Sequence, residues 1–163
     1  MNNSNNSARK NILFVCLGNI CRSPAAEAIF RKRVIEKGED LINEIDSAGL
    51  NGYHNGERAD SRMIRVAQKR GYNITSISRK FNPNIDFDKY DLIIGMDNYN
   101  ISELKKLAKT AEHISKISKM TDYGDSNSYS EVPDPYYGGD EGFVRVLDIL
   151  ENCSDGLITK LKL

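Results

Sequence analysis

The sequence predicts an α/β fold: a single domain built on a four-stranded parallel sheet with helices on both faces. Short apolar runs alternate along the chain with segments of helical periodicity, a pattern typical of strands joined by crossover helices. The length of 163 residues suits one domain with its own hydrophobic core. We find no internal repeat, no linker and no second domain in the sequence.

The first strand and helix are predicted from residues 11–38. The run NILFVC at 11–16 has the length and apolar character of a buried strand. Ser23 and Pro24 then predict the start of a helix, with Ser23 as the N-cap and Pro24 in the first turn, and Gly38 predicts its end. The apolar face of this helix is made by Ala26, Phe30 and Val34.

The next strand and helix follow in the same order. INEIDSAG at 42–49 is a second strand candidate, and residues 59–71 have the periodicity of a second helix. Asp60 is the expected cap of this helix and Gly71 its expected stop. One face of the helix is predicted to carry Met63, Val66, Ala67 and Arg70.

The second half of the chain predicts two more strands and two more helices. YDLIIGM at 90–96 and HISKISKM at 113–120 are the strand candidates, and a long polar loop at 121–142 leads to the last helix. This order is that of Rossmann-like and flavodoxin-like folds, which bind ligands at the carboxyl ends of their strands. The third helix carries Ile101, Leu104, Leu107 and Ala108. The last helix carries Phe143, Val146, Leu147, Leu150, Cys153, Leu157 and Leu161.

Composition and charge exclude several classes of function. The 23 basic and 23 acidic residues cancel without long blocks of one sign, so neither a nucleic acid nor a membrane surface is expected as a partner. No apolar stretch reaches the ~18 residues of a membrane-spanning helix. We expect residues 1–10 to be a disordered polar tail rather than a secretory signal, and the protein to be cytoplasmic. Three cysteines, two of them in one loop, fit a reducing compartment.

The loop CLGNICRS at 16–23 is the first candidate site, because it leaves the carboxyl end of a strand and enters a helix. Backbone N–H groups at such a junction, with the helix dipole, suit a phosphate-sized anion. Gly18 and Asn19 tolerate the positive φ values that such a turn needs, and Arg22 can grip two phosphoryl oxygens. The positive surroundings predict a pKa for Cys16 well below the ~8.5 of a free cysteine. A phosphoryl-transfer site is therefore predicted; the alternative for Cys16 alone is a small core residue.

The segment DPYYGG at 134–139 is the second candidate. An aspartate before a proline is often only a turn former. A loop that follows the last strand can, however, reach the phosphate cradle, and a thiolate mechanism needs a proton donor. Asp134 is therefore the expected acid, whereas Tyr136 and Tyr137, from the residues alone, could be ordinary loop aromatics that pack inward.

The stretch VCLGNICRSPAAEAIF at 15–30 resembles the signature of the low-molecular-weight protein tyrosine phosphatases, with its C-X5-R-S phosphate loop, and DPYYGG resembles their acid loop. DSAG at 46–49 and MD at 96–97 also fit, so the resemblance marks residues 11–163 as a phosphatase domain. It implies hydrolysis of phosphotyrosine in proteins, or of small aryl phosphates, with inorganic phosphate as the product and without a cofactor or a metal.

The resemblance also implies a role for each matching residue. Cys16 would attack phosphorus and become a phosphocysteine, Ser23 would hydrogen-bond the thiolate, and Asp134 would protonate the leaving phenolate and later activate water. Asn19 would hold the loop in shape through Ser47. Phosphoryl oxygens would be bound, without a metal, by the loop residues Leu17, Gly18, Asn19, Ile20, Cys21 and Arg22. The substrate slot would be lined by Leu17, Tyr53, Tyr136 and Tyr137.

The remaining cysteines and the histidines complete the set of candidates. In matching family members a second cysteine at the place of Cys21 forms a reversible disulfide with the nucleophile, whereas from the residues alone it could equally pack under the helix. Cys153 is expected in the core. Many members brace the phosphate loop with a histidine after the second helix, where this chain has Ser76. His54 and His113 have no sequence relation to the nucleophile and lack the spacing of a zinc site.

Two alternatives from other classes remain. An arsenate reductase of the same fold would need further cysteines after the second helix, and residues 24–152 contain none. A non-catalytic phosphotyrosine-binding module would not need the complete set of Cys16, Arg22 and Asp134. Both alternatives are therefore less well supported than a phosphatase.

Overall fold

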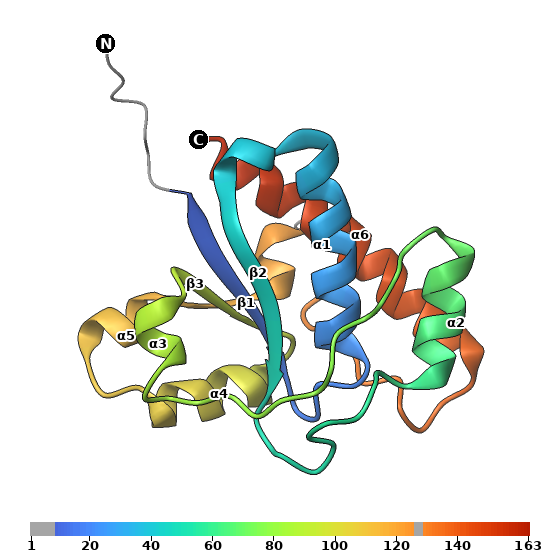
Figure 1. Cartoon of the computed structure of the whole chain (residues 1–163), viewed down its shortest axis with the longest axis horizontal. Coiled ribbons are helices and arrows are strands. Elements are labelled where there is room, and N and C mark those ends of the chain that lie inside the picture. The colour runs from blue at the N-terminus through green and yellow to red at the C-terminus, as the bar shows by residue number, and fades with distance from the viewer. Residues whose placement is uncertain (1–8, 126–128) are drawn as a thin grey trace.

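The computed structural model describes residues 9–125 and 129–163, so residues 1–8 of the expected tail lie outside the described residues. In this part of the chain a four-stranded sheet has all strands parallel, in the order β2-β1-β3-β4 (Figure 1). The predicted α/β class and the parallel sheet are confirmed. The strands are β1 (Lys10–Cys16), β2 (Ile42–Gly49), β3 (Leu92–Gly95) and β4 (Ile117–Lys119).

Helices cover both faces of the sheet, as the sequence predicts (Figure 1). On one side lie α1 (Arg22–Lys37), α2 (Ser61–Lys69) and α6 (Asp140–Leu161), with α6 packed against both α1 and α2. On the other side lie α3 (Asp86–Lys89), α4 (Asn98–Leu107) and α5 (Ala111–Ser115). Two short 3-10 turns are η1 (Glu39–Leu41) and η2 (Met120–Tyr123).

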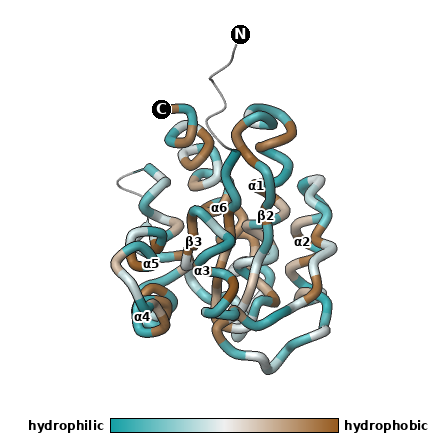
Figure 2. The backbone as a smooth tube through the Cα atoms, turned by 60° about the vertical axis from the view of Figure 1, so that its left-hand side comes forward, coloured by the Kyte–Doolittle hydropathy of each residue, from teal (hydrophilic) through white to brown (hydrophobic). Residues whose placement is uncertain are grey.

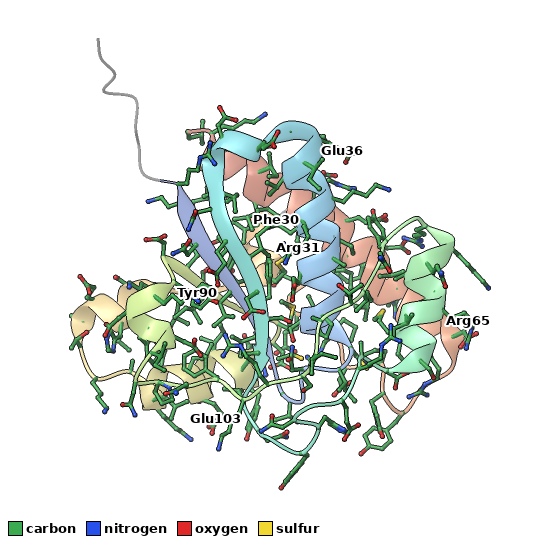
Figure 3. The ribbon with its side chains drawn as sticks, in the orientation of Figure 1. Phe30, Arg31, Glu36, Arg65, Tyr90 and Glu103 are labelled. Carbon is green, nitrogen blue, oxygen red and sulfur yellow. The ribbon has the colours of Figure 1, made fainter. Side chains whose placement is uncertain are left out.

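The central strand β1 contributes to both hydrophobic layers. Phe14 faces α1, where its ring meets that of Phe30 edge to face with centroids 5.6 Å apart. Figure 3 shows Phe30 on α1. Leu13 and Val15 point to the other layer and pack with Phe87. A strand buried on both sides has an uninterrupted apolar run, which explains why β1 is so clear in the sequence. Along α1 and α2, by contrast, brown and teal alternate in Figure 2, as expected for helices with one buried face.

The predicted starts of two helices have different outcomes. The cap of α2 is confirmed, because the Asp60 carboxylate accepts a hydrogen bond from the Arg62 N–H, and Gly71 after the helix has φ of 84°. For α1 the predicted N-cap is wrong: the helix begins at Arg22, so Ser23 lies inside its first turn and the capping position makes no side-chain hydrogen bond. The first-turn Pro24 and the end of the helix at Gly38 are as predicted. The Ser23 hydroxyl is instead directed to the Cys16 sulfur, 3.0 Å away.

The prediction of a strand over 113–120 is correct only in part. Residues 117–119 form β4, but residues 111–115 form α5, capped by the Thr110 hydroxyl, which accepts a hydrogen bond from the His113 N–H. The short apolar pattern of this segment is compatible with either a helix or a strand. The N-cap at Thr110 favours the helix over residues 111–115. Within the described part of the chain, no helix combines the length and apolar character needed to cross a bilayer.

Candidate active site

The loop between β1 and α1 turns its carbonyl groups away from its centre. Four of these oxygens accept hydrogen bonds of 2.8 to 3.1 Å from donors outside the loop. In a trans peptide the N–H points opposite to the C=O, so the N–H groups that follow these carbonyls face the inside of the loop. The hydrogen bonds found among the described residues use none of the N–H groups of residues 17–21 as donors. The acceptor–donor pairs are Cys16 with Leu50, Leu17 with Asn51, Gly18 with Ser78, and Ile20 with Asp60.

These inward N–H groups lie at the N-terminus of α1, where the helix dipole adds partial positive charge. A concavity of unpaired backbone donors of this kind is suited to a tetrahedral anion. The predicted phosphate cradle therefore has the expected backbone arrangement.

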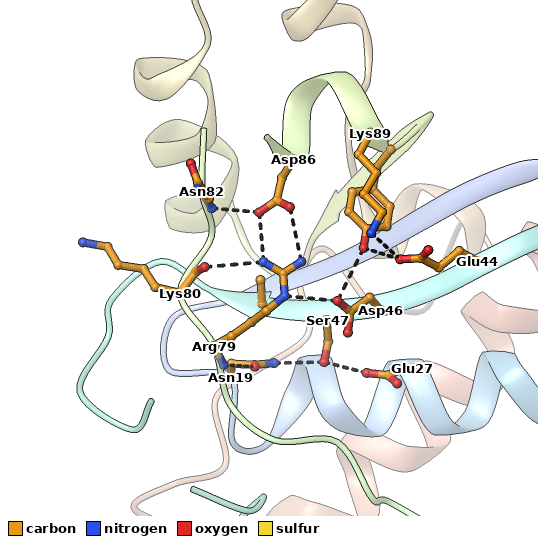
Figure 4. A network of polar contacts seen from close by, with 12 residues as sticks. Asn19, Glu27, Glu44, Asp46, Ser47, Arg79, Lys80, Asn82, Asp86 and Lys89 are labelled. Carbon is orange, nitrogen blue, oxygen red and sulfur yellow. Dashed lines mark hydrogen bonds and ion pairs between the residues drawn. The ribbon is translucent and has the colours of Figure 1, made fainter. Parts of the chain in front are cut away.

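A chain of buried hydrogen bonds runs from the cysteine into the core of the protein. The Cys16 sulfur lies 3.0 Å from the Ser23 hydroxyl, and the Asn19 amide donates to Ser23 at 2.8 Å and to Ser47 at 3.0 Å. Ser47 in turn donates to the Glu27 carboxylate at 2.7 Å (Figure 4). Because Ser23 already accepts from Asn19, its own hydrogen is available to the sulfur. The predicted contact of Asn19 with Ser47 is present.

The turn conformation of the loop depends on Asn19 alone. Asn19 has φ of 58°, whereas Gly18 is outside the positive-φ region, so the prediction for Gly18 is wrong. Space favours glycine at this position, because a Cβ there would lie 3.3 Å from the His54 ring and would push it aside. Gly49 at the end of β2 also allows a close approach, since its Cβ would lie 3.0 Å from the Gly18 carbonyl carbon.

A second brace holds the loop from outside. The Ser78 hydroxyl donates to the Gly18 carbonyl at 3.1 Å, and the Arg79 N–H donates to the Asn19 side chain at 3.0 Å. The Arg79 guanidinium is fixed by Asp46 and Asp86, each at 3.0 Å (Figure 4). The sequence pointed to Ser76 in this segment, but the contact comes from Ser78 two residues later.

Arg22 connects the cradle to two other segments. Its side chain is only 3% exposed, and its guanidinium donates to the Asp97 carboxylate at 2.6 Å and to the Val132 carbonyl at 3.1 Å. The Asp134 carboxylate lies 3.7 Å away. Burial opposes the charge of Arg22, but Cys16, Asp97 and Asp134 outweigh it and raise the pKa of the guanidinium above its ordinary value.

The sequence reasoning missed Asp97 as a site residue. Its second carboxylate oxygen caps α4 by accepting from the Asn100 N–H, so one side chain both starts a helix and orients Arg22. Its only signal in the sequence was the MD pair at the end of a strand.

A cavity of about 300 Å³ opens above the cradle. Cys16, Cys21 and Arg22 are its buried members, and the Asp134 side chain is 45% exposed. Tyr53 and Tyr137, at 85% and 95% exposure, stand at the rim. All the residues predicted for the slot and the acid line it together: Leu17, Tyr53, Asp134, Tyr136 and Tyr137.

His54 also lines this cavity, although the sequence offered no reason to connect it with Cys16. Its ring packs on Gly18, and its Nδ1 lies 3.2 Å from the Glu57 carboxylate. Only the fold of the 50–57 loop brings it there.

Cys21 and Cys153 are free, buried thiols. Burial, assisted by the charges of Asp60 and Cys16, raises the pKa of Cys21 above its ordinary value. Burial likewise raises the pKa of Cys153 to about 12, and this cysteine packs in the core as predicted.

Comparison with known proteins agrees with this geometry. Residues 11–163 match the family described as low molecular weight phosphotyrosine protein phosphatase. The low molecular weight protein-tyrosine-phosphatase of Streptomyces coelicolor is 39% identical over 153 residues, which cover 93% of each chain. A crystal structure of a protein tyrosine phosphatase from Entamoeba histolytica, with Hepes in its active site, has 47% identity and a TM-score of 0.88 over 94% of this chain and 97% of that one. The crystal structure of a Drosophila arginine phosphatase has 29% identity and a TM-score of 0.85 over 94% and 98% of the two chains. The chain thus belongs to the low molecular weight protein-tyrosine-phosphatase family of hydrolases.

Proposed function

We propose that the protein hydrolyses phosphotyrosine and other aryl phosphate monoesters through a phosphocysteine on Cys16. One observation carries the proposal: a single cavity brings together the Cys16 sulfur, a buried Arg22 and the Asp134 carboxyl above inward-facing N–H groups. A nucleophile, an anion cradle and a proton donor are the parts that such a reaction needs. Tyrosine-phosphorylated proteins are the proposed partners.

In the first step the Cys16 thiolate attacks phosphorus in line, so that a P–S bond forms while the bond from phosphorus to the aryl oxygen breaks. Asp134 gives its proton to the departing phenolate. The N–H groups of the loop and the Arg22 guanidinium hold the three other oxygens, on which the charge is concentrated.

In the second step a water molecule attacks the phosphocysteine. Asp134, now a carboxylate, takes a proton from this water, the P–S bond breaks and inorganic phosphate leaves. The sulfur departs as a thiolate, which the Ser23 hydroxyl, 3.0 Å away, stabilises by a hydrogen bond. Both steps then use the same four side chains.

The shape of the cavity supports an aryl substrate. Tyr136 and Tyr137 meet edge to face, with centroids 5.0 Å apart, and line the cavity together with Asp134, Leu17 and Tyr53. Aromatic walls of this kind favour a phenyl ring. A phosphotyrosine peptide should therefore be hydrolysed at least ~10-fold faster than a phosphoarginine peptide, a difference of about 1.4 kcal/mol. The reverse order would group the chain with arginine phosphatases instead.

The decisive experiment is phosphate release from a phosphotyrosine peptide in EDTA at pH 5 to 7. We expect turnover by the wild type, none by Cys16→Ser, and near-normal turnover by Cys153→Ala, which changes a cysteine outside the cavity. Binding without turnover by the wild type would favour a phosphotyrosine-binding module. Turnover by Cys16→Ser would exclude the thiolate mechanism, and thiol-dependent reduction of arsenate without phosphate release would favour the reductase.

We also propose that Cys21 protects Cys16 from irreversible oxidation. Peroxide would convert the Cys16 thiolate to a sulfenic acid, and the Cys21 sulfur would then displace water to form a disulfide. Mass spectrometry of peroxide-treated protein should find the peptides of Cys16 and Cys21 linked. Over-oxidised Cys16 with no linked peptide would refute this.

A further inference from the structure

The segment that follows Asp134 has few polar attachments to the rest of the protein. Before Asp134 the chain is fixed, because the Val132 N–H donates to the Met96 carbonyl at 2.9 Å and its carbonyl accepts from Arg22. Over residues 135–139 the main contacts are internal turns, such as the Gly138 N–H to the Pro135 carbonyl. The Tyr136 N–H also turns back to the Asp134 carboxylate, at 3.1 Å.

Arg62, at the start of α2, makes a polar contact with this segment from outside it. Its guanidinium donates to the Tyr136 carbonyl at 3.0 Å and lies 5.5 Å from the Tyr136 ring centroid. It also stacks over Phe143 in α6, 4.7 Å from the ring centroid. Arg62 therefore touches both the backbone and the ring of the residue two positions after Asp134.

The orientation of Arg62 is itself fixed. Its Nε and Nη2 bind the two carboxylate oxygens of Asp60 at 3.1 and 2.9 Å, the fork geometry that only arginine offers. This pairing also neutralises the charge of Arg62, so the guanidinium is not a free cation for substrate.

The same short segment supports the phosphate loop. The Asp60 N–H donates to the Ile20 carbonyl at 2.8 Å, one of the outward contacts that turn the loop N–H groups inward. Asp60 and Arg62 thus join the loop of the nucleophile to the loop of the acid.

We propose that Arg62 is a positioning residue, which holds the 134–139 segment so that the Asp134 carboxyl stays within reach of the leaving oxygen. The inference rests on the proposed function, in which Asp134 is the proton donor. Arg62 lies outside the set of residues that line the cavity and acts through the Tyr136 backbone. Its loss should therefore affect proton transfer and leave the phosphate cradle competent.

The test compares two substrates. Phosphotyrosine has a leaving group with a pKa near ~10 and needs the proton, whereas an aryl phosphate with a strongly acidic phenol does not. For Arg62→Met we expect kcat/KM, which reports the first chemical step and not the hydrolysis of the phosphocysteine, to fall about 10-fold on the phosphotyrosine peptide and less than about 3-fold on the activated ester. The matched control is Arg65→Met on the outer side of α2 (Figure 3), which removes the hydrogen bonds from Nη2 to the Asp140 carboxylate but no contact with Tyr136. It should change both rates less than about 2-fold.

A double variant separates positioning from general destabilisation. If Arg62 acts through Asp134, then Arg62→Met should have almost no further effect on kcat/KM in an Asp134→Asn background. Equal losses on both substrates, or additive losses in the double variant, would overturn the inference. If Arg62→Met does not fold, Arg62→Lys should be tested instead. Lysine cannot bind both oxygens of Asp60 through two nitrogens, so the same selectivity between the substrates is expected.

Failure of the proposed function has a different signature. If Asp134→Asn alone lowered both rates equally, the acid role of Asp134 would fail and the role of Arg62 with it. If Asp134→Asn were selective for phosphotyrosine and neither Arg62 variant were, only the inference would fail.

Discussion

The phosphate loop and the acid loop form one cavity but are held in different ways. The phosphate loop, residues 16–23, is bonded through its carbonyls to three separate segments, and its polar members Asn19, Arg22 and Ser23 are at most 3% exposed. The acid loop, residues 132–139, depends on Met96, Arg22 and Arg62, and most of its residues are exposed.

The difference corresponds to what each loop must do. A nucleophile and an anion cradle work only if their donors are fixed before the substrate arrives. A loop that lines the entrance must admit the aryl group and release it, which suits a segment with few buried contacts. We therefore expect changes in the phosphate loop to affect both stability and kcat, and changes in the acid loop to affect activity with little change in stability.

The largest effect is expected where the two loops meet, at Asp97→Asn. Asparagine caps a helix as well as aspartate does, so α4 should persist, but Arg22 loses its charge-assisted partner at 2.6 Å. Such a bond contributes about 1.5–3 kcal/mol, so kcat/KM on a phosphotyrosine peptide should fall about 10- to 100-fold. The melting temperature should also fall by several degrees, because the buried guanidinium loses the same partner.

The control for Asp97→Asn is Glu131→Gln, whose carboxylate accepts from the Asn98 N–H at the same helix start without contacting Arg22. A loss of less than about 3-fold for Asp97→Asn would mean that the Val132 carbonyl alone orients Arg22.

The phosphate loop was predictable because its functional atoms come from consecutive residues. The offsets of Cys16, Asn19 and Arg22 are fixed by one turn between a strand and a helix. Asp97 and Arg62 were not predictable, because each meets its partner across 74 or 75 residues of chain. Each also has a local explanation that hides its role: Asp97 caps α4, and Arg62 pairs with the cap of α2.

The fold shows the same limit at its boundaries. A serine before a proline is by itself a signal for an N-cap. The Ser23 hydroxyl instead contacts the Cys16 sulfur, which is a requirement of the active site and not of the helix. The Gly18 prediction failed similarly, because the reason for glycine is the His54 ring 36 residues later, a tertiary contact. Elements with long apolar runs, such as β1, depend less on such contacts and were predicted well.

The next effect in size is expected for Ser47→Ala in the brace of the phosphate loop. The change removes an acceptor of the Asn19 amide and the donor to the buried Glu27 carboxylate. Leaving such groups unpaired costs about 1–3 kcal/mol, so the melting temperature should fall by several degrees and kcat about 10-fold. Thermal unfolding and steady-state kinetics should be measured beside Ser115→Ala, an exposed hydroxyl with one backbone contact. An unchanged melting temperature would contradict the difference between the two loops.

A smaller effect concerns stability at alkaline pH. Burial raises the pKa of Cys21 above 9.0, its ordinary value, so the folded state keeps the thiol proton after the unfolded state has lost it. The contribution of Cys21 to the free energy of unfolding is then constant below about pH 9. Above that pH it falls, by at most about 1.4 kcal/mol per pH unit. Between pH 8 and 10, urea unfolding should show a loss of free energy that is about 1 kcal/mol smaller in Cys21→Ala than in the wild type. Parallel losses would mean that the Cys21 thiol is not shielded from water.

The smallest effect is expected at the rim, for Tyr137→Ala in the acid loop. Tyr137 is 95% exposed, and its aromatic contact is the edge-to-face pair with Tyr136. An exposed side chain contributes within about 0.5 kcal/mol to stability, so the melting temperature should not move measurably. A phenyl ring bound beside the Tyr136–Tyr137 pair would lose one aromatic contact, so KM for a phosphotyrosine peptide should rise about 2- to 4-fold while kcat stays the same. Tyr99→Ala, a half-exposed tyrosine on α4 that does not line the cavity, should change neither constant. If Tyr137→Ala instead lowered kcat, the Tyr137 ring would be helping to hold Asp134 in place. The conformation of the acid loop would then depend on the Tyr136–Tyr137 contact as well as on Arg62.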